Sequence, residues 1–155
     1  MKNIVLCILA AFCLVNCKKT EVSMTEQEKP QTNYQILVQN KWKIASDWIT
    51  TETESYDAFK NVDTFHKDNW FVFNSDSLMV QYTGLLKCNA SEAESLTIGK
   101  WQVSSDFKTF SYSPISGQQK VVFEVKEINN NVLLLESKDQ IPGLKMTRLL
   151  RYVSL

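Results

Sequence analysis

Apolar and polar residues alternate along most of the chain after residue 40, with the period of two that predicts half-buried β-strands. In the first such stretch, KWKIASDW, the pattern places Trp42, Ile44 and Trp48 on one face of a strand. Aromatic and β-branched residues recur in the same way in later segments. These segments are 69–74, 78–84, 98–104, 107–113, 120–128, 131–138 and 145–153. The pattern therefore predicts about eight strands.

Turn-forming residues separate the predicted strands. They occur at 74–77, 104–106, 114–117, 129–131 and 142–143. Because most links are short, neighbouring strands should pair antiparallel. The later strands have no helix-length amphipathic segment between them, which excludes the parallel α/β folds and leaves a sandwich or an up-and-down barrel. Consecutive hairpins favour the barrel, in which the last strand returns to pair with the first and removes exposed edges.

The N-terminus follows a different pattern. One positive charge at Lys2 precedes a charge-free apolar run that ends in LVNC at 14–17. This order of a charged region, an apolar region and a processing site is typical of a secretory signal peptide. LVNC also resembles the lipobox of bacterial lipoproteins, whose cysteine becomes diacylated. We expect residues 1–16 to be a signal helix and Cys17 to carry the lipid, because two acyl chains anchor a protein stably. The alternative is an uncleaved apolar helix with an incidental cysteine.

Residues 17–36 form the second predicted region, a lipidated cysteine followed by a flexible tether. From 18 to 35 the sequence is polar, contains one proline and lacks apolar periodicity. Residues 37–155 are long enough for a single domain with its own core. We therefore expect a lipid-anchored domain in the cell envelope, most simply at the outer membrane, with its periplasmic or surface orientation left open.

Charge and cysteine content narrow the choice of partners. The chain has 17 basic and 17 acidic residues, and removal of Lys2 with the signal leaves 16 against 17. This balance argues against nucleic acid and anionic surfaces as partners. We expect a monomer that is attached to the membrane through its lipid. Of the 4 cysteines, only Cys88 lies beyond Cys17. We expect no disulfide within the mature chain. The Cys88 thiol is then either buried or available for pairing between molecules, and we favour the buried thiol, the usual state of a free cysteine.

The order of several short motifs resembles a known family. NKWKIASDWI, KDNWFVFNSDSLMVQYTG, KC and IGKWQVSSDFKTFSY resemble the lipocalin-like domains of small bacterial lipoproteins of the Bacteroidetes type, over about residues 38–153. The resemblance implies an all-β, eight-stranded antiparallel up-and-down barrel, closed where Trp42 enters and open at the other end. It also implies a structural stacking contact between Trp42 and an arginine of the last strand. Arg148 and Arg151 are the candidates, and we favour Arg148.

The long connection at 50–67 is the first-choice binding element. In the lipocalin pattern the first connection is a lid over the barrel mouth, and this one carries aromatic side chains; the alternative is a plain surface loop. The residues expected to bind an apolar ligand are Trp48, Tyr56, Phe59, Phe71, Phe73 and Trp101.

Enzymatic and metal-dependent functions find little support. His66 is the only histidine, and no nucleophile with a local catalytic signature accompanies it. Asp57, Asp63 and Asp68 lie near it, but their spacing matches neither a calcium loop nor a zinc motif. We therefore expect no enzyme, no metal and no cofactor. Two functions remain: a barrel that binds a small apolar molecule, and a non-catalytic envelope interaction or structural module whose barrel is filled by its own side chains.

Overall fold

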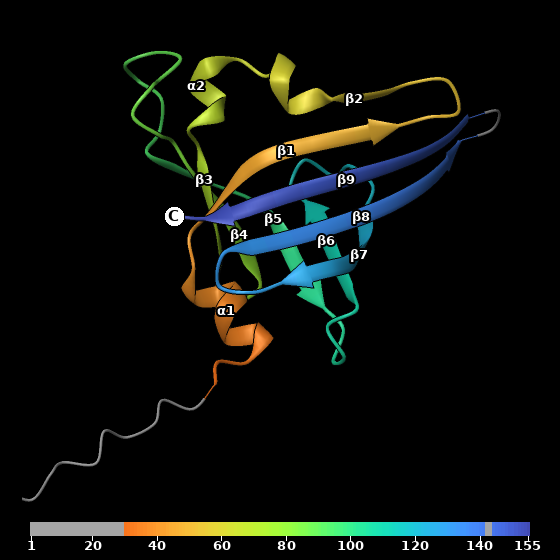
Figure 1. Ribbon diagram of the computed structural model, residues 1–155. Coiled ribbons are helices and arrows are strands. Elements are labelled where there is room, and N and C mark those ends of the chain that lie inside the picture. Colours follow the sequence, from red (N-terminus) through yellow and green to blue (C-terminus); the bar gives the residue numbers. More distant parts are fainter. Residues whose placement is uncertain (1–29, 142–143) are drawn as a thin grey trace, which may run out of the picture.

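The computed structural model describes residues 30–141 and 144–155, which form a closed antiparallel barrel (Figure 1). From β3 to β9 each strand pairs with the next in the sequence, and β9 returns to pair with β1. This order confirms the predicted eight-stranded up-and-down barrel, the architecture of lipocalins. The predicted signal helix lies outside the described residues. The elements are α1 (Asn33–Gln39), β1 (Trp42–Thr50), β2 (Ser55–Asp57), η1 (Ala58–Asn61), α2 (Thr64–Lys67), β3 (Trp70–Phe73), β4 (Leu78–Tyr82), β5 (Ser95–Val103), β6 (Thr109–Pro114), β7 (Val121–Ile128), β8 (Val132–Ile141) and β9 (Leu144–Ser154).

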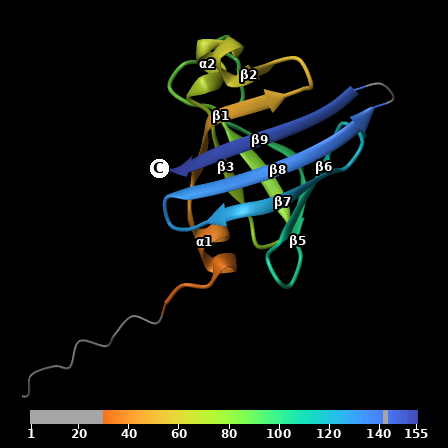
Figure 2. The same cartoon turned by 45° about the vertical axis from the view of Figure 1, so that its right-hand side comes forward.

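Helix α1 closes one end of the barrel, as the resemblance implied (Figure 2). A capping box begins the helix: the backbone N–H of Gln35 donates to the Thr32 hydroxyl, and the Gln35 side chain accepts from the Thr32 N–H. Ile36 and Leu37 are buried in the core, so the ordered domain begins a few residues before the expected boundary at 37. The Trp42 indole N–H donates to the Leu37 carbonyl at 3.0 Å, which joins the helix to β1. In the described part of the chain, no helix is long and apolar enough to cross a membrane.

Large aromatic side chains fill the half of the barrel next to α1. Phe73 is fully buried, and its ring meets Trp101, Phe110 and Tyr152 edge-on, with centroids 5.5 to 6.2 Å apart. Edge-to-face pairs of this kind add about 0.5–1.5 kcal/mol each beyond the burial of area. The Trp101 indole N–H is shared between the carbonyls of Asn74 and Leu78, at 3.2 Å each. These contacts pack the aromatic rings of this half closely around Phe73.

An irregularity in β1 reverses the face on which its side chains lie. The pairing with β9 shifts just after Ile44, and from there Asp47 stands opposite the buried Leu150. Asp47 therefore points into the barrel and Trp48 points out, with 41% of its surface exposed. The prediction that Trp48 shares the inner face with Trp42 is wrong, because one extra residue in a β-bulge inverts the alternation that follows.

The segment from β2 to α2 lies along the edge of β1 that faces away from β9 (Figures 1 and 2). β1 pairs with β3 only at Trp42 and Phe71, so most of this edge needs other partners. β2 pairs with the last residues of β1, and the Asp57 carboxylate accepts from the Asp47 N–H at 2.9 Å and the Phe59 N–H at 3.1 Å. The segment thus covers an edge that would otherwise expose unpaired backbone groups.

Candidate functional site: a cavity in the open half of the barrel

A cavity of about 260 Å³ occupies the half of the barrel that α1 does not fill. Residues from all eight barrel strands line it, together with the connection between β6 and β7. The lining residues are Ile44, Phe71, Met79, Ile98, Phe110, Tyr112, Pro114, Gln118, Gln119, Val121, Phe123, Leu135, Arg148, Leu150 and Tyr152.

The size and chemistry of this cavity suit a small, mostly apolar molecule. Its wall is mainly aliphatic and aromatic, with few polar groups, which is the usual composition of a small-molecule site. A dry apolar cavity of about 150 Å³ takes benzene, whereas sites for drug-sized ligands span about 300–1,000 Å³. A cavity of about 260 Å³ therefore matches a molecule of one or two rings.

An ion pair provides the main polar feature of the wall. Arg148 donates from Nε and Nη2 to the two carboxylate oxygens of Asp47, each at 2.7 Å. The Asp47 side chain is 14% exposed and that of Arg148 36%, so the pair is partly shielded from water. The hydrogen bonds that Arg148 donates to Asp47 raise the pKa of Arg148 above its ordinary value. This fork geometry fixes the guanidinium in the wall and balances its charge.

Two tyrosines in the wall differ in how their hydroxyls are used. The Tyr112 hydroxyl donates to the Ile98 carbonyl at 2.9 Å. Gly99 gives the Tyr112 ring its space, because a Cβ at this position would lie 2.6 Å from the Ser113 carbonyl and press on the ring. Tyr152 is 5% exposed and its hydroxyl has no hydrogen-bond partner among the described residues. Burial raises the pKa of both phenols, most strongly that of Tyr152.

The connection between β6 and β7 forms the mouth of the cavity. Gln118 and Gln119 line the cavity and are themselves exposed to solvent. No residue of the 50–67 segment lines it. The expectation that this segment is the lid is therefore corrected: it packs along β1, because the sparse pairing between β1 and β3 leaves that edge uncovered.

Of the six residues predicted to bind ligand, only Phe71 lies in the cavity wall. Phe73 and Trp101 are buried in the packed half instead. Trp48 lies on the outer side of the barrel, with the Lys60 ammonium 5.9 Å from the centroid of its ring. Tyr56 and Phe59 lie in the segment beside β1.

The expected contact between Arg148 and Trp42 is also corrected. In the β1–β9 ladder, Trp42 stands opposite Ser154 and Arg148 opposite Ile49, so the two residues are near opposite ends of β1. Arg148 binds Asp47 instead. The bulge made this pairing possible by turning Asp47 inward, a change that simple alternation does not predict.

Much of the actual wall was missed by sequence reasoning. Val121, Leu135 and Leu150 occupy inward positions of predicted strands, so their faces were predictable. The choice among inward positions was made by aromatic character, which favoured the residues that fill space. A better signal is small or aliphatic side chains at inward positions, because these leave volume free.

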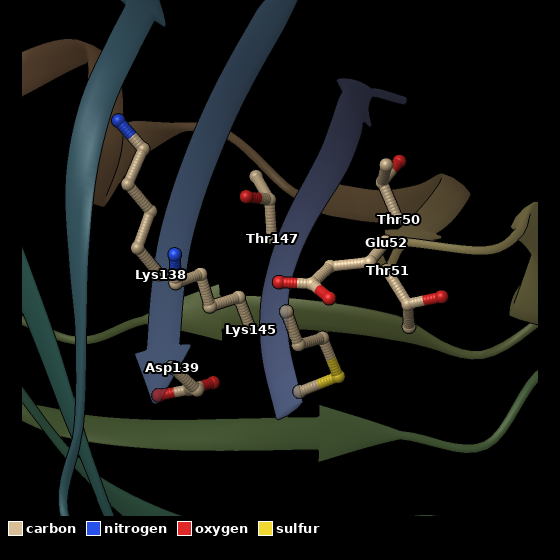
Figure 3. A pocket seen from close by; sticks show the side chains of 8 residues that line it. Thr50, Thr51, Glu52, Lys138, Asp139, Lys145 and Thr147 are labelled. Carbon is tan, nitrogen blue, oxygen red and sulfur yellow. The ribbon is translucent and has the colours of Figure 1, made fainter. Parts of the chain in front are cut away.

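A second hollow in the described part of the chain lacks the apolar wall of this cavity. This hollow of about 270 Å³ at the end of the β8–β9 hairpin is surrounded by mixed charges, including Lys138, Lys145 and Glu52 (Figure 3). No group of three metal-ligating side chains occurs in residues 30–141 and 144–155. Cys88 is exposed, which corrects the expectation of a buried thiol, because the loop between β4 and β5 lies on the surface.

Comparison with known proteins finds similarity to solved structures. No known protein family matches the sequence, and no curated protein matches it. A complex of bovine odorant binding protein with a selenium-containing odorant matches over 84% of this chain and 77% of that chain, with 15% identity and a TM-score of 0.45. The lipocalin-like barrel is defined by the strand pairings of the chain itself.

Proposed function

We propose that this protein binds a small apolar molecule inside its barrel and acts as a non-catalytic carrier. The cavity of about 260 Å³ is the observation that supports this function. It is lined by buried side chains such as Phe71, Phe123 and Leu135, which favour transfer of an apolar ligand from water by about 25 cal/mol per Å² of surface buried.

The size of the cavity sets the expected affinity. A two-ring molecule has about ten non-hydrogen atoms, and small ligands gain between about 0.3 and 1.5 kcal/mol per atom. Intermediate values correspond to dissociation constants of about 1–100 μM. Long fatty acids and retinoids exceed this volume, so they are poor first choices for a ligand panel.

The second candidate is an envelope interaction or structural module with a side-chain-filled barrel. The packing around Phe73 and Trp101 supports this reading for the half beside α1. The open half differs because its inward residues leave a volume larger than a dry cavity that takes benzene. We therefore favour ligand binding.

Calorimetric titration of residues 30–155 with naphthalene-sized compounds tests the function. Val121→Trp should abolish binding, because Val121 lines the cavity and the larger ring would occupy it. Val122→Trp is the matched control: Val122 is the next residue of β7, is 52% exposed and does not line the cavity, so binding should persist. Absence of saturable binding across the panel, or equal loss in both variants, would favour the interaction module.

We also propose that the domain is held in the cell envelope, at the outer membrane, by lipid on Cys17, as a monomer. This proposal rests on the LVNC motif and the apolar run before it. Cys17 lies outside the described residues. Labelled palmitate should enter the wild type and be lost in Cys17→Ala, and equal labelling of the two would refute the anchor.

A further inference from the structure

The polar groups of the cavity wall indicate which chemical group the ligand carries in addition to its apolar part. The inference that follows rests on the proposed function, since it concerns the ligand of the same cavity. We infer that the ligand is uncharged and carries one hydrogen-bond acceptor, such as a ketone or aldehyde oxygen, which the Tyr152 hydroxyl binds.

First, the Tyr152 hydroxyl is a donor that the protein itself does not engage. The side chain lines the cavity and is 5% exposed, and its hydroxyl has no partner among the described residues. Among the described residues, the fully buried side-chain atoms without a partner are Asp68 Oδ1 and Ser137 Oγ, so the Tyr152 hydroxyl is not sealed in the core but can be reached from the cavity. A ligand oxygen in the cavity could accept a hydrogen bond from it, and one such bond has a net value of about 0.5–1.5 kcal/mol.

The second step is the contrast with Tyr112. Both phenols lie in the wall, but the Tyr112 hydroxyl is already engaged by the Ile98 carbonyl at 2.9 Å. Tyr152 is therefore the tyrosine of this cavity whose donor remains available to a bound molecule.

The third step concerns charge. Arg148 is the cation in the cavity wall, and Asp47 neutralises it through two hydrogen bonds. Asp139 is a further carboxylate close enough to influence the pKa of Arg148. A carboxylate ligand would lose its hydration without gaining a net positive partner, a costly exchange in a shielded site. The wall therefore favours a neutral acceptor over an anion.

Three probes of nearly equal shape test the inference by calorimetry at neutral pH. These are 2-acetylnaphthalene, which has a ketone, 2-ethylnaphthalene, which lacks it, and 2-naphthoate, which is anionic. We expect the ketone to bind about 3–10-fold more tightly than the hydrocarbon, the range of one net hydrogen bond. The anion should bind at least about tenfold more weakly than the ketone.

Variants then assign the effect to residues. Tyr152→Phe should make the ketone and the hydrocarbon bind equally, whereas Tyr112→Phe should leave their ratio unchanged. Asp47→Asn, which unbalances Arg148, should improve binding of 2-naphthoate relative to the ketone. Thermal unfolding of each variant confirms that it is folded.

The outcomes separate this inference from the proposed function. If the ketone and hydrocarbon bind equally to the wild type, or if Tyr152→Phe preserves their ratio, the inference is overturned while ligand binding stands. If 2-naphthoate binds best to the wild type, the neutral class is wrong. If none of the three probes binds, the proposed function itself fails.

Discussion

The two halves of the barrel differ in how their interiors are occupied. Beside α1, the rings of Phe73 and Trp101 meet edge-on, and the Trp42 indole is bonded to Leu37 of the helix, all within one buried cluster. In the other half the inward side chains stop short of one another and leave about 260 Å³. An interior of this width is just filled by large side chains or just able to hold one small ligand.

The two halves also have different roles, although the same strands form both: the packed half stabilises the fold, and the hollow half offers polar groups to a ligand. The packed half has its polar groups paired, as in the bond from the Trp42 indole to Leu37. The hollow half holds an ion pair and an unpartnered phenol in place of apolar filling. Polar groups of this kind stabilise a fold weakly but orient a ligand well. We therefore expect mutations in the two halves to affect different properties.

The largest expected effect is that of Phe73→Ala in the packed half. Removing this ring should lower the free energy of unfolding by about 3–5 kcal/mol, because the surrounding aromatic side chains cannot collapse into the space. Val121→Ala in the hollow half should cost about 1 kcal/mol, since its side chain already borders empty volume. Urea denaturation of both variants measures the contrast, and equal losses would mean that the halves are packed alike.

Breaking the ion pair should have an intermediate effect on stability. Asp47→Ala leaves the partly shielded Arg148 without its partner, at a cost of roughly 1–3 kcal/mol, between the values for exposed and buried pairs. The double variant Asp47→Ala/Arg148→Met should recover much of this loss, because no unpaired charge remains. If the double variant is no more stable than Asp47→Ala, the unpaired charge of Arg148 is not the cause of the lost stability.

Removing the helix cap should weaken the packed half by a smaller amount. Thr32→Ala deletes the hydroxyl that accepts from the Gln35 N–H, which should cost about 1 kcal/mol. Thr32→Ser retains the hydroxyl and serves as the control. The midpoint of chemical denaturation should fall for alanine only, while affinity for a cavity ligand stays unchanged. A parallel loss of affinity would show that the two halves are not independent.

The smallest effect concerns alkaline pH. Burial keeps Tyr152 protonated in the folded protein to a higher pH than in the unfolded chain, whose phenol ionises near pH 10. Stability from this group is therefore complete below about pH 10 and falls as the pH rises, by about 1 kcal/mol at pH 11. Tyr152→Phe should show a shallower loss of stability over this interval in urea titrations. If stability depends on pH identically in the wild type and in Tyr152→Phe, the Tyr152 phenol is exposed to water in the folded protein.

The sequence predicted the barrel well because its signals are local and repeated. Alternation and turn residues predict all eight barrel strands, and the family resemblance places the closed end at Trp42, where α1 lies. The tether predicted at 17–36 includes the first turn of helix α1, although Thr32 and Gln35 form a capping box that is visible in the sequence.

The site was harder to predict because it depends on tertiary detail. A single bulge after Ile44 turns Trp48 outward and Asp47 inward. No residue in this stretch predicts a bulge from the sequence. The role of Arg148 changed with it. The position of the 50–67 segment followed from the sparse pairing of β1 with β3, which only the closed barrel reveals.

The central claim is that the hollow half of the barrel takes a small apolar molecule. Crystals soaked with 2-bromonaphthalene test it directly, because anomalous scattering locates the bromine without assumptions about the ligand pose. We predict one strong peak inside the barrel, among Phe71, Phe123 and Leu135, in the wild type and in Val122→Trp, and none there in Val121→Trp. Bromine found only on the outer surface, for example beside Trp48 and Tyr56, or an interior peak that persists in Val121→Trp, would contradict the account.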